Sequence, residues 1–121
     1  MDDFLKRTWL EIDLDAIRGN YQKNTLLVAP EAKVMAVIKA DAYGHGVEYT
    51  AREMSGAGVD WFAVSNLEEA IQVRRAGLDN PLLILAIRRR NMRSSLRLNG
   101  ISQAVFDENY GRQLAAVRNG M

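Results

Sequence analysis

Residues 36–46 read AVIKADAYGHG, and this stretch decides the fold. It closes an apolar run, residues 34–38, that has the length of a buried strand, and Lys39 follows this run directly. Gly44 and Gly46 then punctuate a loop that leads into a helical pattern. In a parallel barrel, the carboxyl end of a strand is where active sites form. The stretch therefore predicts a strand, a loop that carries functional residues, and a helix.

Three similar apolar runs follow, at residues 61–64, 81–87 and 103–106. Equivalent points of the four runs are spaced by 28, 21 and 21 residues, at Val34, Phe62, Leu83 and Ala104. None of the runs alternates apolar with polar residues, which predicts that both faces of each strand are covered. Helical patterns lie between the runs, and this order is typical of βαβ units with a parallel sheet.

The predicted class is therefore α/β, a partial (β/α)8 barrel of the TIM type with about four βα units. One extra strand, residues 8–14, is expected to precede them. A closed barrel usually takes about 250 residues. The 121 residues are therefore expected to form a single domain, 1–121, that is the N-terminal half of such a barrel, without its C-terminal half.

Three of the helices can be placed from the sequence, two of them by capping signals. Asp15 is the expected N-cap of a helix with Ile17, Tyr21, Leu27 and Val28 on one side, which Pro30 ends. Asn66 and Glu69 form a capping-box pattern, in which Glu69 would reach back to the backbone of Asn66, and Gly77 ends that helix. The last helix is expected at residues 108–117.

The composition excludes several kinds of chemistry. The chain has no cysteine and a single histidine, His45, so thiolate chemistry and a transition-metal cluster are not expected. It lacks a long apolar run and a basic, apolar leader, which predicts a cytoplasmic protein without a membrane span. The net charge of +1 and the lack of interleaved aromatic residues also speak against nucleic-acid binding, despite an arginine-rich segment at 88–97.

Lys39 is the residue with the clearest chemical potential. Its neighbours Ile38 and Ala40 would partly desolvate the amine and lower its pKa, so that the neutral amine could condense with an aldehyde. Spacing alone favours the alternative, a lysine whose stem lies along the strand end and whose charge reaches water. Tyr43 lies within reach of a phosphate or ring at the same strand end, or it is an ordinary surface tyrosine.

The whole stretch of eleven residues resembles the cofactor-lysine signature of the alanine racemase family. Residues 9–17 resemble that family's first strand and helix, and residues 62–70 resemble its next strand and helix start. The resemblance runs from about residue 7 to residue 85 and again from residue 99 to residue 117.

The resemblance implies a (β/α)8-barrel enzyme that interconverts L-alanine and D-alanine with pyridoxal phosphate and supplies D-alanine for peptidoglycan. Lys39 would hold the cofactor as a Schiff base and act as one catalytic base. Tyr43 would contact the cofactor phosphate, and Leu85 would pack against the cofactor. Asp41 and His45 are assigned roles in the shape and hydrogen bonding of the loop.

The family's other catalytic groups have no counterpart in this sequence. The resemblance implies that the second base is a tyrosine from the C-terminal domain of a partner subunit, in a homodimer. A histidine and an arginine that tune the cofactor ring come from later barrel strands. The chain of 121 residues is therefore expected to be inactive alone.

Residues 86–94 depart from the family, which usually continues Gly-Tyr-Thr-Pro-Pro-Glu-Tyr-Ala-Lys. The codons GGC TAT ACG CCG CCG GAA TAT GCG AAG encode that run. Read one base later, they spell residues 86–93 of this chain and allow Ser94. The hypothesis is a compensated frameshift, and the alternative is a diverged basic surface helix. Resequencing the source DNA distinguishes them, because an arginine codon run with no displaced family frame contradicts the frameshift.

Two other functions are compatible with the sequence. A pyridoxal-phosphate barrel with another activity, such as a serine or broad-specificity racemase, a decarboxylase or a cofactor carrier, would also have a lysine at its first strand. The continuation after Lys39 argues against the decarboxylase and the carrier only. The second possibility is a non-catalytic half barrel that associates with itself through its open sheet.

Overall fold

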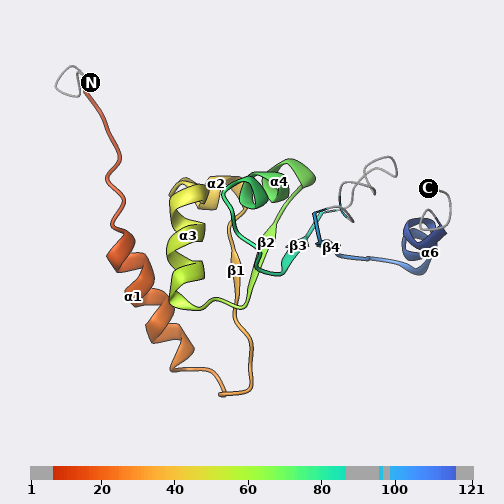
Figure 1. The fold of residues 1–121 in the computed structure, drawn as a ribbon, viewed down its shortest axis with the longest axis horizontal. Helices are drawn as coiled ribbons and strands as arrows, with labels where there is room; N and C mark the ends of the chain where they lie inside the picture. Colours follow the sequence, from red (N-terminus) through yellow and green to blue (C-terminus); the bar gives the residue numbers. More distant parts are fainter. Residues whose placement is uncertain (1–6, 87–95, 97–98, 117–121) are drawn as a thin grey trace.

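The computed structural model describes residues 7–86, 96 and 99–116. Its centre is a four-stranded parallel sheet in the order β1-β2-β3-β4 (Figure 1). The strands are β1 (Met35–Val37), β2 (Trp61–Val64), β3 (Leu82–Ile84) and β4 (Ile101–Gln103). Sequential neighbours pair throughout, which confirms the predicted α/β class with a parallel sheet.

The first three strands lie inside the apolar runs that predicted them, but β4 lies earlier than expected. The prediction placed this strand at residues 103–106, whereas the sheet pairs Ile101, Ser102 and Gln103 with the residues of β3. Ile101 is buried in the core, whereas Val105 and Phe106 are 54% and 58% exposed. The burial of Ile101 explains the shift, because a strand takes the register that puts its apolar side chain in the core.

The predicted N-terminal strand is not found. Residues 8–13 belong to neither a helix nor the sheet, and α1 (Leu14–Thr25) begins directly after them. A strand needs a neighbour to accept its backbone hydrogen bonds, and no neighbouring strand for residues 8–13 is present in the described part of the chain.

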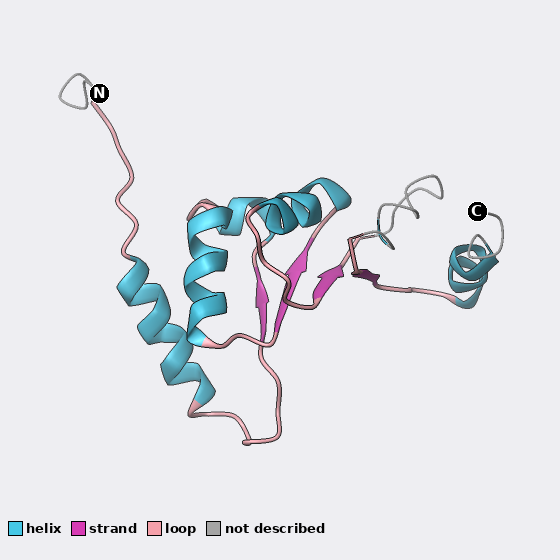
Figure 2. Cartoon of the chain, in the orientation of Figure 1, coloured by secondary structure: helices cyan, strands magenta, loops and turns pink. Residues whose placement is uncertain are grey.

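The cap and the end of α1 also differ from the prediction. Asp13, rather than Asp15, caps the helix, because its Oδ1 accepts the Ala16 N–H at 3.0 Å. The helix ends at Thr25, and Leu27 and Val28, expected on its apolar side, lie beyond it and are exposed. Figure 2 shows α1 on the outer side of α3 (Val47–Ala57). Arg18 of α1 forms an ion pair with Glu53 of α3 at 2.7 Å.

The other helices follow their strands as the sequence predicts. Asn66 caps α4 (Leu67–Arg75), where its side chain accepts the Glu69 N–H at 2.9 Å. The last described helix is α6 (Glu108–Ala116). Most of the arginine-rich segment, namely residues 87–95 and 97–98, lies outside the described residues. None of the described helices has the length and hydropathy of a membrane-spanning segment.

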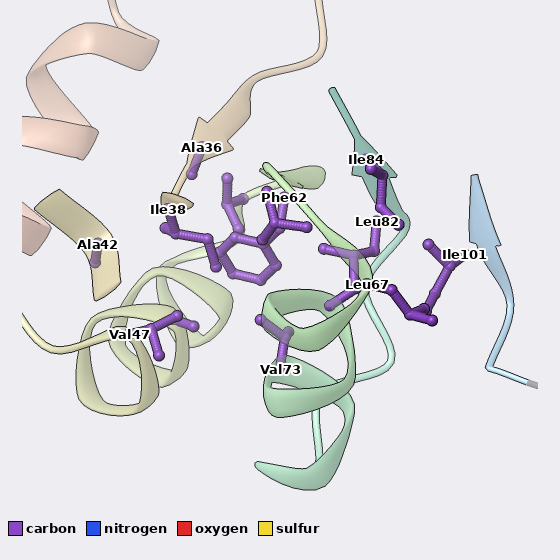
Figure 3. Close-up of a cluster of buried hydrophobic side chains, with 14 of the residues drawn as sticks. Ala36, Ile38, Ala42, Val47, Phe62, Leu67, Val73, Leu82, Ile84 and Ile101 are labelled. Carbon is purple, nitrogen blue, oxygen red and sulfur yellow. The ribbon is translucent and has the colours of Figure 1, made fainter. Parts of the chain in front are cut away.

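The hydrophobic core lies between the sheet and the helices α3 and α4 (Figure 3). Phe62 is its largest fully buried side chain, with Ile38, Leu82 and Ile84 around it on the strands. The helices contribute small and medium side chains, Val47, Ala51, Leu67, Ala70 and Val73. Successive side chains of a strand point to opposite faces of the sheet, so every second strand residue enters this core.

The opposite face of the sheet is open, contrary to the prediction that both faces are covered. Met35 and Val37 of β1 are 39% and 40% exposed, whereas Ala36 and Ile38, which alternate with them along the chain, are buried. Leu83 of β3 is half-buried. The described helices that bury most of the helical side chains, α3 and α4, pack on the other face, so Met35 and Val37 lack cover, whereas Ala63 of β2 on the same face is 0% exposed. This is the face that would point into the interior of a closed barrel.

Arg74 connects the loops at the amino ends of β3 and β4. Its guanidinium donates to four backbone carbonyls, those of Asn99, Leu78, Asn80 and Gly100, at 2.7 to 3.0 Å. Burial lowers the pKa of Arg74, and the charge of Asp79 opposes this shift. One side chain of α4 thus ties together two loops that are otherwise separated in the sequence.

Thr50 carries a buried hydroxyl without a hydrogen-bond partner among the described residues. Its side chain is 5% exposed, on the core side of α3. We expect Thr50→Val to raise the free energy of unfolding by about 1 kcal/mol, because it replaces an unsatisfied polar group with a methyl group. Urea unfolding measures the change. Thr25→Val is the control, because the Thr25 hydroxyl donates to the Gln22 carbonyl and its removal should not stabilise the fold. If Thr50→Val is destabilised instead, the Thr50 hydroxyl has a hydrogen-bond partner.

Candidate functional site

Lys39 lies where the sequence predicts it, directly after β1 at the carboxyl edge of the sheet. The Ile38 N–H donates to the Ala63 carbonyl at 2.9 Å, so the pairing with β2 continues up to the residue before the lysine. The Ile38 side chain is 2% exposed, which fixes this strand end in the core. Lys39 itself is half-buried and points away from the Ile38 side of the strand.

The segment after Lys39 is a left-handed helical turn, α2 (Lys39–Tyr43). Ala40, Asp41, Ala42 and Tyr43 all have positive φ, between 52° and 57°. Left-handed helix costs roughly 1–2 kcal/mol per L-residue, so four in a row need compensation. The residue types of the turn do not predict four left-handed residues in a row, and the glycines that signal positive φ, Gly44 and Gly46, follow the turn.

Hydrogen bonds within the turn provide part of the compensation. The Ala42 N–H donates to the Ile38 carbonyl at 3.0 Å, and the Gly44 N–H donates to the Ala40 carbonyl at 3.1 Å. His45 adds a contact between its Nδ1 and the Ala42 carbonyl at 2.8 Å. The Ala42 side chain is 4% exposed in the core, which anchors the middle of the turn.

Asp41 holds the far end of the turn. Its Oδ1 accepts the N–H of Val47, the first residue of α3, at 2.8 Å. Gly46 precedes α3 without a side chain of its own, so Asp41 supplies the acceptor that an N-cap residue normally provides. The geometry agrees with the loop-shaping role expected for Asp41 and His45.

Lys39 and Tyr43 lie close together, at the two ends of the turn. The Lys39 Nζ lies 6.0 Å from the centroid of the Tyr43 ring. The Tyr43 side chain is 59% exposed, so its hydroxyl is accessible to a ligand. An amine and a phenol are therefore presented on the same edge of the sheet.

Leu85 lies on the same edge, two strands from Lys39. Val37, Ala63 and Leu83 are register partners across the sheet, so Lys39, Ser65 and Leu85 follow in the next row on the same face. The usual strand spacing puts Leu85 about 10 Å from the Lys39 backbone. The Leu85 side chain is half-buried, and its N–H donates to the Val64 carbonyl at 2.9 Å.

Glu69 has a role in the site that differs from the capping role that its sequence pattern predicts. The capping-box pattern predicted that its carboxylate returns to the Asn66 backbone. Instead, Oε1 accepts the Ala40 N–H at 3.0 Å and Oε2 accepts the Ser65 N–H at 2.7 Å. The acceptor in the turn lies 29 residues away in the sequence, so no local pattern could have revealed it.

The described residues contain no group of three or more His, Cys, Asp or Glu side chains that could hold a metal ion. The ionisable groups of the site are Lys39, Asp41, Tyr43, His45 and Glu69, and the two carboxylates accept backbone N–H groups. The arrangement can therefore present one amine, held near a phenol, to an electrophile that approaches the carboxyl edge of the sheet.

We expect Ala40→Gly to raise the free energy of unfolding by about 1 kcal/mol. The relief of left-handed strain at φ 52° should outweigh the extra chain entropy that glycine loses on folding. Ala40 is exposed, so no packing is lost. The matched control is Ala16→Gly in α1, where the same change should destabilise by about 0.5–1 kcal/mol. Equal destabilisation of both variants in urea would contradict the left-handed turn.

Comparison with known proteins identifies one family. The family model described as "Alanine racemase, N-terminal domain" matches residues 12–120. Alanine racemase 1 of Caldanaerobacter subterraneus subsp. tengcongensis is 37% identical over 112 residues, which are 93% of this chain and 29% of that protein.

Solved structures agree with this family. The alanine racemase of Clostridium difficile 630 in complex with cycloserine has a TM-score of 0.89 at 30% identity and covers 96% of this chain. The alanine racemase of Bacillus anthracis with bound L-Ala-P has a TM-score of 0.87 at 30% identity and covers 98% of this chain. The chain spans 32% and 31% of the length of these two proteins.

Proposed function

Since the chain belongs to the alanine racemase N-terminal domain family, we propose that it provides the pyridoxal-phosphate-binding part of an alanine racemase, with Lys39 as the residue that holds the cofactor covalently. The observation that carries this proposal is the placement of Lys39 on the carboxyl edge of the sheet, 6.0 Å from the Tyr43 ring. The likeness to structures with L-Ala-P and cycloserine supports an amino-acid substrate.

The chemistry of the site residues fits pyridoxal phosphate. Its aldehyde needs a primary amine, and Lys39 presents one that is half-buried. Its phosphate needs hydrogen-bond donors, and the hydroxyl of Tyr43 is accessible for this role. Its ring needs an apolar surface, and the half-buried Leu85 lies on the same sheet face as Lys39. We propose these three residues as the cofactor-binding set.

When bound, pyridoxal phosphate acts as an electron sink that makes the Cα proton of the amino acid acidic. Lys39 would then take or return this proton on one face of Cα, as a general base held at the strand end. Racemisation also needs a second base on the opposite face. We propose that this base comes from family segments beyond the 29–32% that the chain covers in its relatives, or from a partner copy.

The substrate, the product and the setting of the reaction follow from the same proposal. We propose L-alanine and D-alanine as the interconverted pair, with D-alanine used for peptidoglycan, in a cytoplasmic homo-oligomer. The single domain of 1–121 would then act as one portion of the barrel, inactive in isolation. A racemase for serine or for several amino acids is the alternative, because the proposed site residues would contact the cofactor rather than the substrate side chain.

A spectroscopic titration tests the binding proposal. Pyridoxal phosphate is added to the purified chain and to Lys39→Ala, and absorbance is followed in the visible range. We expect a saturable band with the natural chain that Lys39→Ala lacks. A band of equal size in both would show that another amine reacts, and would contradict Lys39 as the anchor. Lys23→Ala is the control for an exposed lysine.

The open sheet face favours a second candidate function, a half barrel that associates with itself. Met35 and Val37 are exposed on this face, and Leu83 is only half-buried. Covering them with a second copy would remove apolar surface from water. Sedimentation of the natural chain and of Val37→Glu tests this: association that the charged variant abolishes supports it, and a monomer in both contradicts it.

A further inference from the structure

Glu69 links the two strand ends nearest to Lys39. Its Oε1 accepts the Ala40 N–H at 3.0 Å, and its Oε2 accepts the Ser65 N–H at 2.7 Å. Ala40 is the residue after Lys39, and Ser65 is the residue after β2. Both carboxylate oxygens are therefore used, and each accepts from a different strand end. Hydrogen bonds to an ionised acceptor are about twice as strong as neutral ones.

The position of Glu69 is itself fixed. Its backbone N–H donates to the Asn66 side chain at 2.9 Å, at the start of α4. The neighbouring helix residues Leu67 and Ala70 are 5% and 0% exposed in the core, so this turn of the helix cannot easily move. The carboxylate is half-buried, which limits competition from water. A rigid helix start thus holds the backbone next to Lys39.

Glu69 contacts the backbone at Ala40, the residue where φ changes from negative to positive. Ile38 has φ −121°, whereas Ala40 has φ 52° and begins the run of left-handed residues. Asp41 holds the other end of the turn through Val47. Without Glu69, the Ala40 N–H would lose its acceptor, and the first left-handed residue would be free to relax. Because Lys39 lies directly before this point, such a relaxation would redirect its side chain.

We propose that Glu69 is a positioning residue for Lys39. It holds the Ala40 and Ser65 amides so that the lysine amine stays at the carboxyl edge of the sheet. This inference rests on the proposed role of Lys39 as the cofactor anchor. It assigns Glu69 no contact with substrate or cofactor. It also gives a reason why a glutamate, rather than any helix-forming residue, occupies this place in α4, since two acceptors on one side chain are needed.

The test uses the full chain with three variants, Glu69→Ala, Glu69→Gln and the control Glu68→Gln. Glu68 is the exposed neighbour in the same helix turn, so the control removes the same charge. The first readout is hydrogen exchange of the Ala40 and Ser65 amides by NMR. Glu69→Ala is expected to speed exchange at both by about tenfold to a hundredfold. Glu69→Gln keeps one acceptor oxygen and should protect only one of the two amides.

The second readout is the reactivity of the lysine, measured without pyridoxal phosphate. Reductive methylation with formaldehyde is mapped at Lys39 and at the exposed Lys23 in each variant. We expect Lys39 to react more slowly than Lys23 in the natural chain, and the two rates to become equal within about twofold in Glu69→Ala. A structural role elsewhere in α4 would leave this ratio unchanged.

The third readout is covalent capture of pyridoxal phosphate at Lys39, expected to fall about tenfold in Glu69→Ala and to be unchanged in Glu68→Gln. Unchanged exchange at Ala40, or faster exchange with an unchanged methylation ratio, overturns the positioning role. If Glu69→Ala does not fold, Glu69→Gln decides, and unchanged exchange at both the Ala40 and the Ser65 amide then overturns the positioning role. Absence of capture by the natural chain counts against the proposed function instead, and the first two readouts still decide the role of Glu69.

Discussion

Replacing Phe62 with alanine is expected to lower the free energy of unfolding by about 3–5 kcal/mol. Phe62 is 0% exposed and lies where the sheet meets α3 and α4 (Figure 3). The substitution removes most of the side chain at the point where Ile38 and Leu82 also pack, so the cavity cannot be filled by solvent. Folded domains are stable by only about 5–15 kcal/mol, so the loss is a large part of the total.

Chemical denaturation of Phe62→Ala measures this effect, and Phe106→Ala is the matched control. Phe106 is 58% exposed just after β4, so its truncation should cost well under 1 kcal/mol. Equal costs for the two variants would contradict the placement of the core on the α3 and α4 side of the sheet. A loss in Phe106→Ala alone would contradict this placement as well.

Replacing Arg74 with methionine is expected to cost about 3 kcal/mol of stability. The change keeps most of the apolar stem but removes the guanidinium that donates to four backbone carbonyls. Water can reach part of this half-buried group, so the cost stays below the sum of four buried charged hydrogen bonds. The loops before β3 and β4 should loosen first, because these carbonyls belong to them.

Arg75→Met is the control for Arg74→Met, since Arg75 is exposed in the same last turn of α4. Its loss removes only a favourable charge at the helix end, worth about 0.3–1 kcal/mol. Urea midpoints, with hydrogen exchange at residues 99–103, give both the size and the location of the effect. A similar small cost for both variants would show that the four carbonyl contacts contribute little.

Local patterns in the sequence predicted the elements that depend only on interactions between residues close together in the sequence. The cap at Asn66, the strand at residues 61–64 and the helix beginning at Glu108 all agree with the structure. An N-cap needs only a side chain and the next turn, and a buried strand needs only a short apolar run. The carboxyl-edge position of Lys39 follows from the same signals.

The features that the sequence did not predict depend on contacts between distant elements. Arg74 and Glu69 look like the charged face of a helix, yet each also has a partner 25 to 29 residues away in another loop. The left-handed turn that begins at Ala40 is held by Glu69 of α4 as well as by its own Asp41, which accepts the Val47 N–H. The open face could not be read from apolar runs, because covered and uncovered apolar residues look alike in a sequence.

We propose Lys39 as the amine that holds pyridoxal phosphate. The most direct measurement is borohydride reduction of the chain mixed with pyridoxal phosphate, followed by mapping of the modified lysine by mass spectrometry. We predict that the label is on Lys39 and is lost in Lys39→Ala, with little on Lys6, Lys23 or Lys33. A label spread over all four lysines, or one that persists in Lys39→Ala, would contradict the claim.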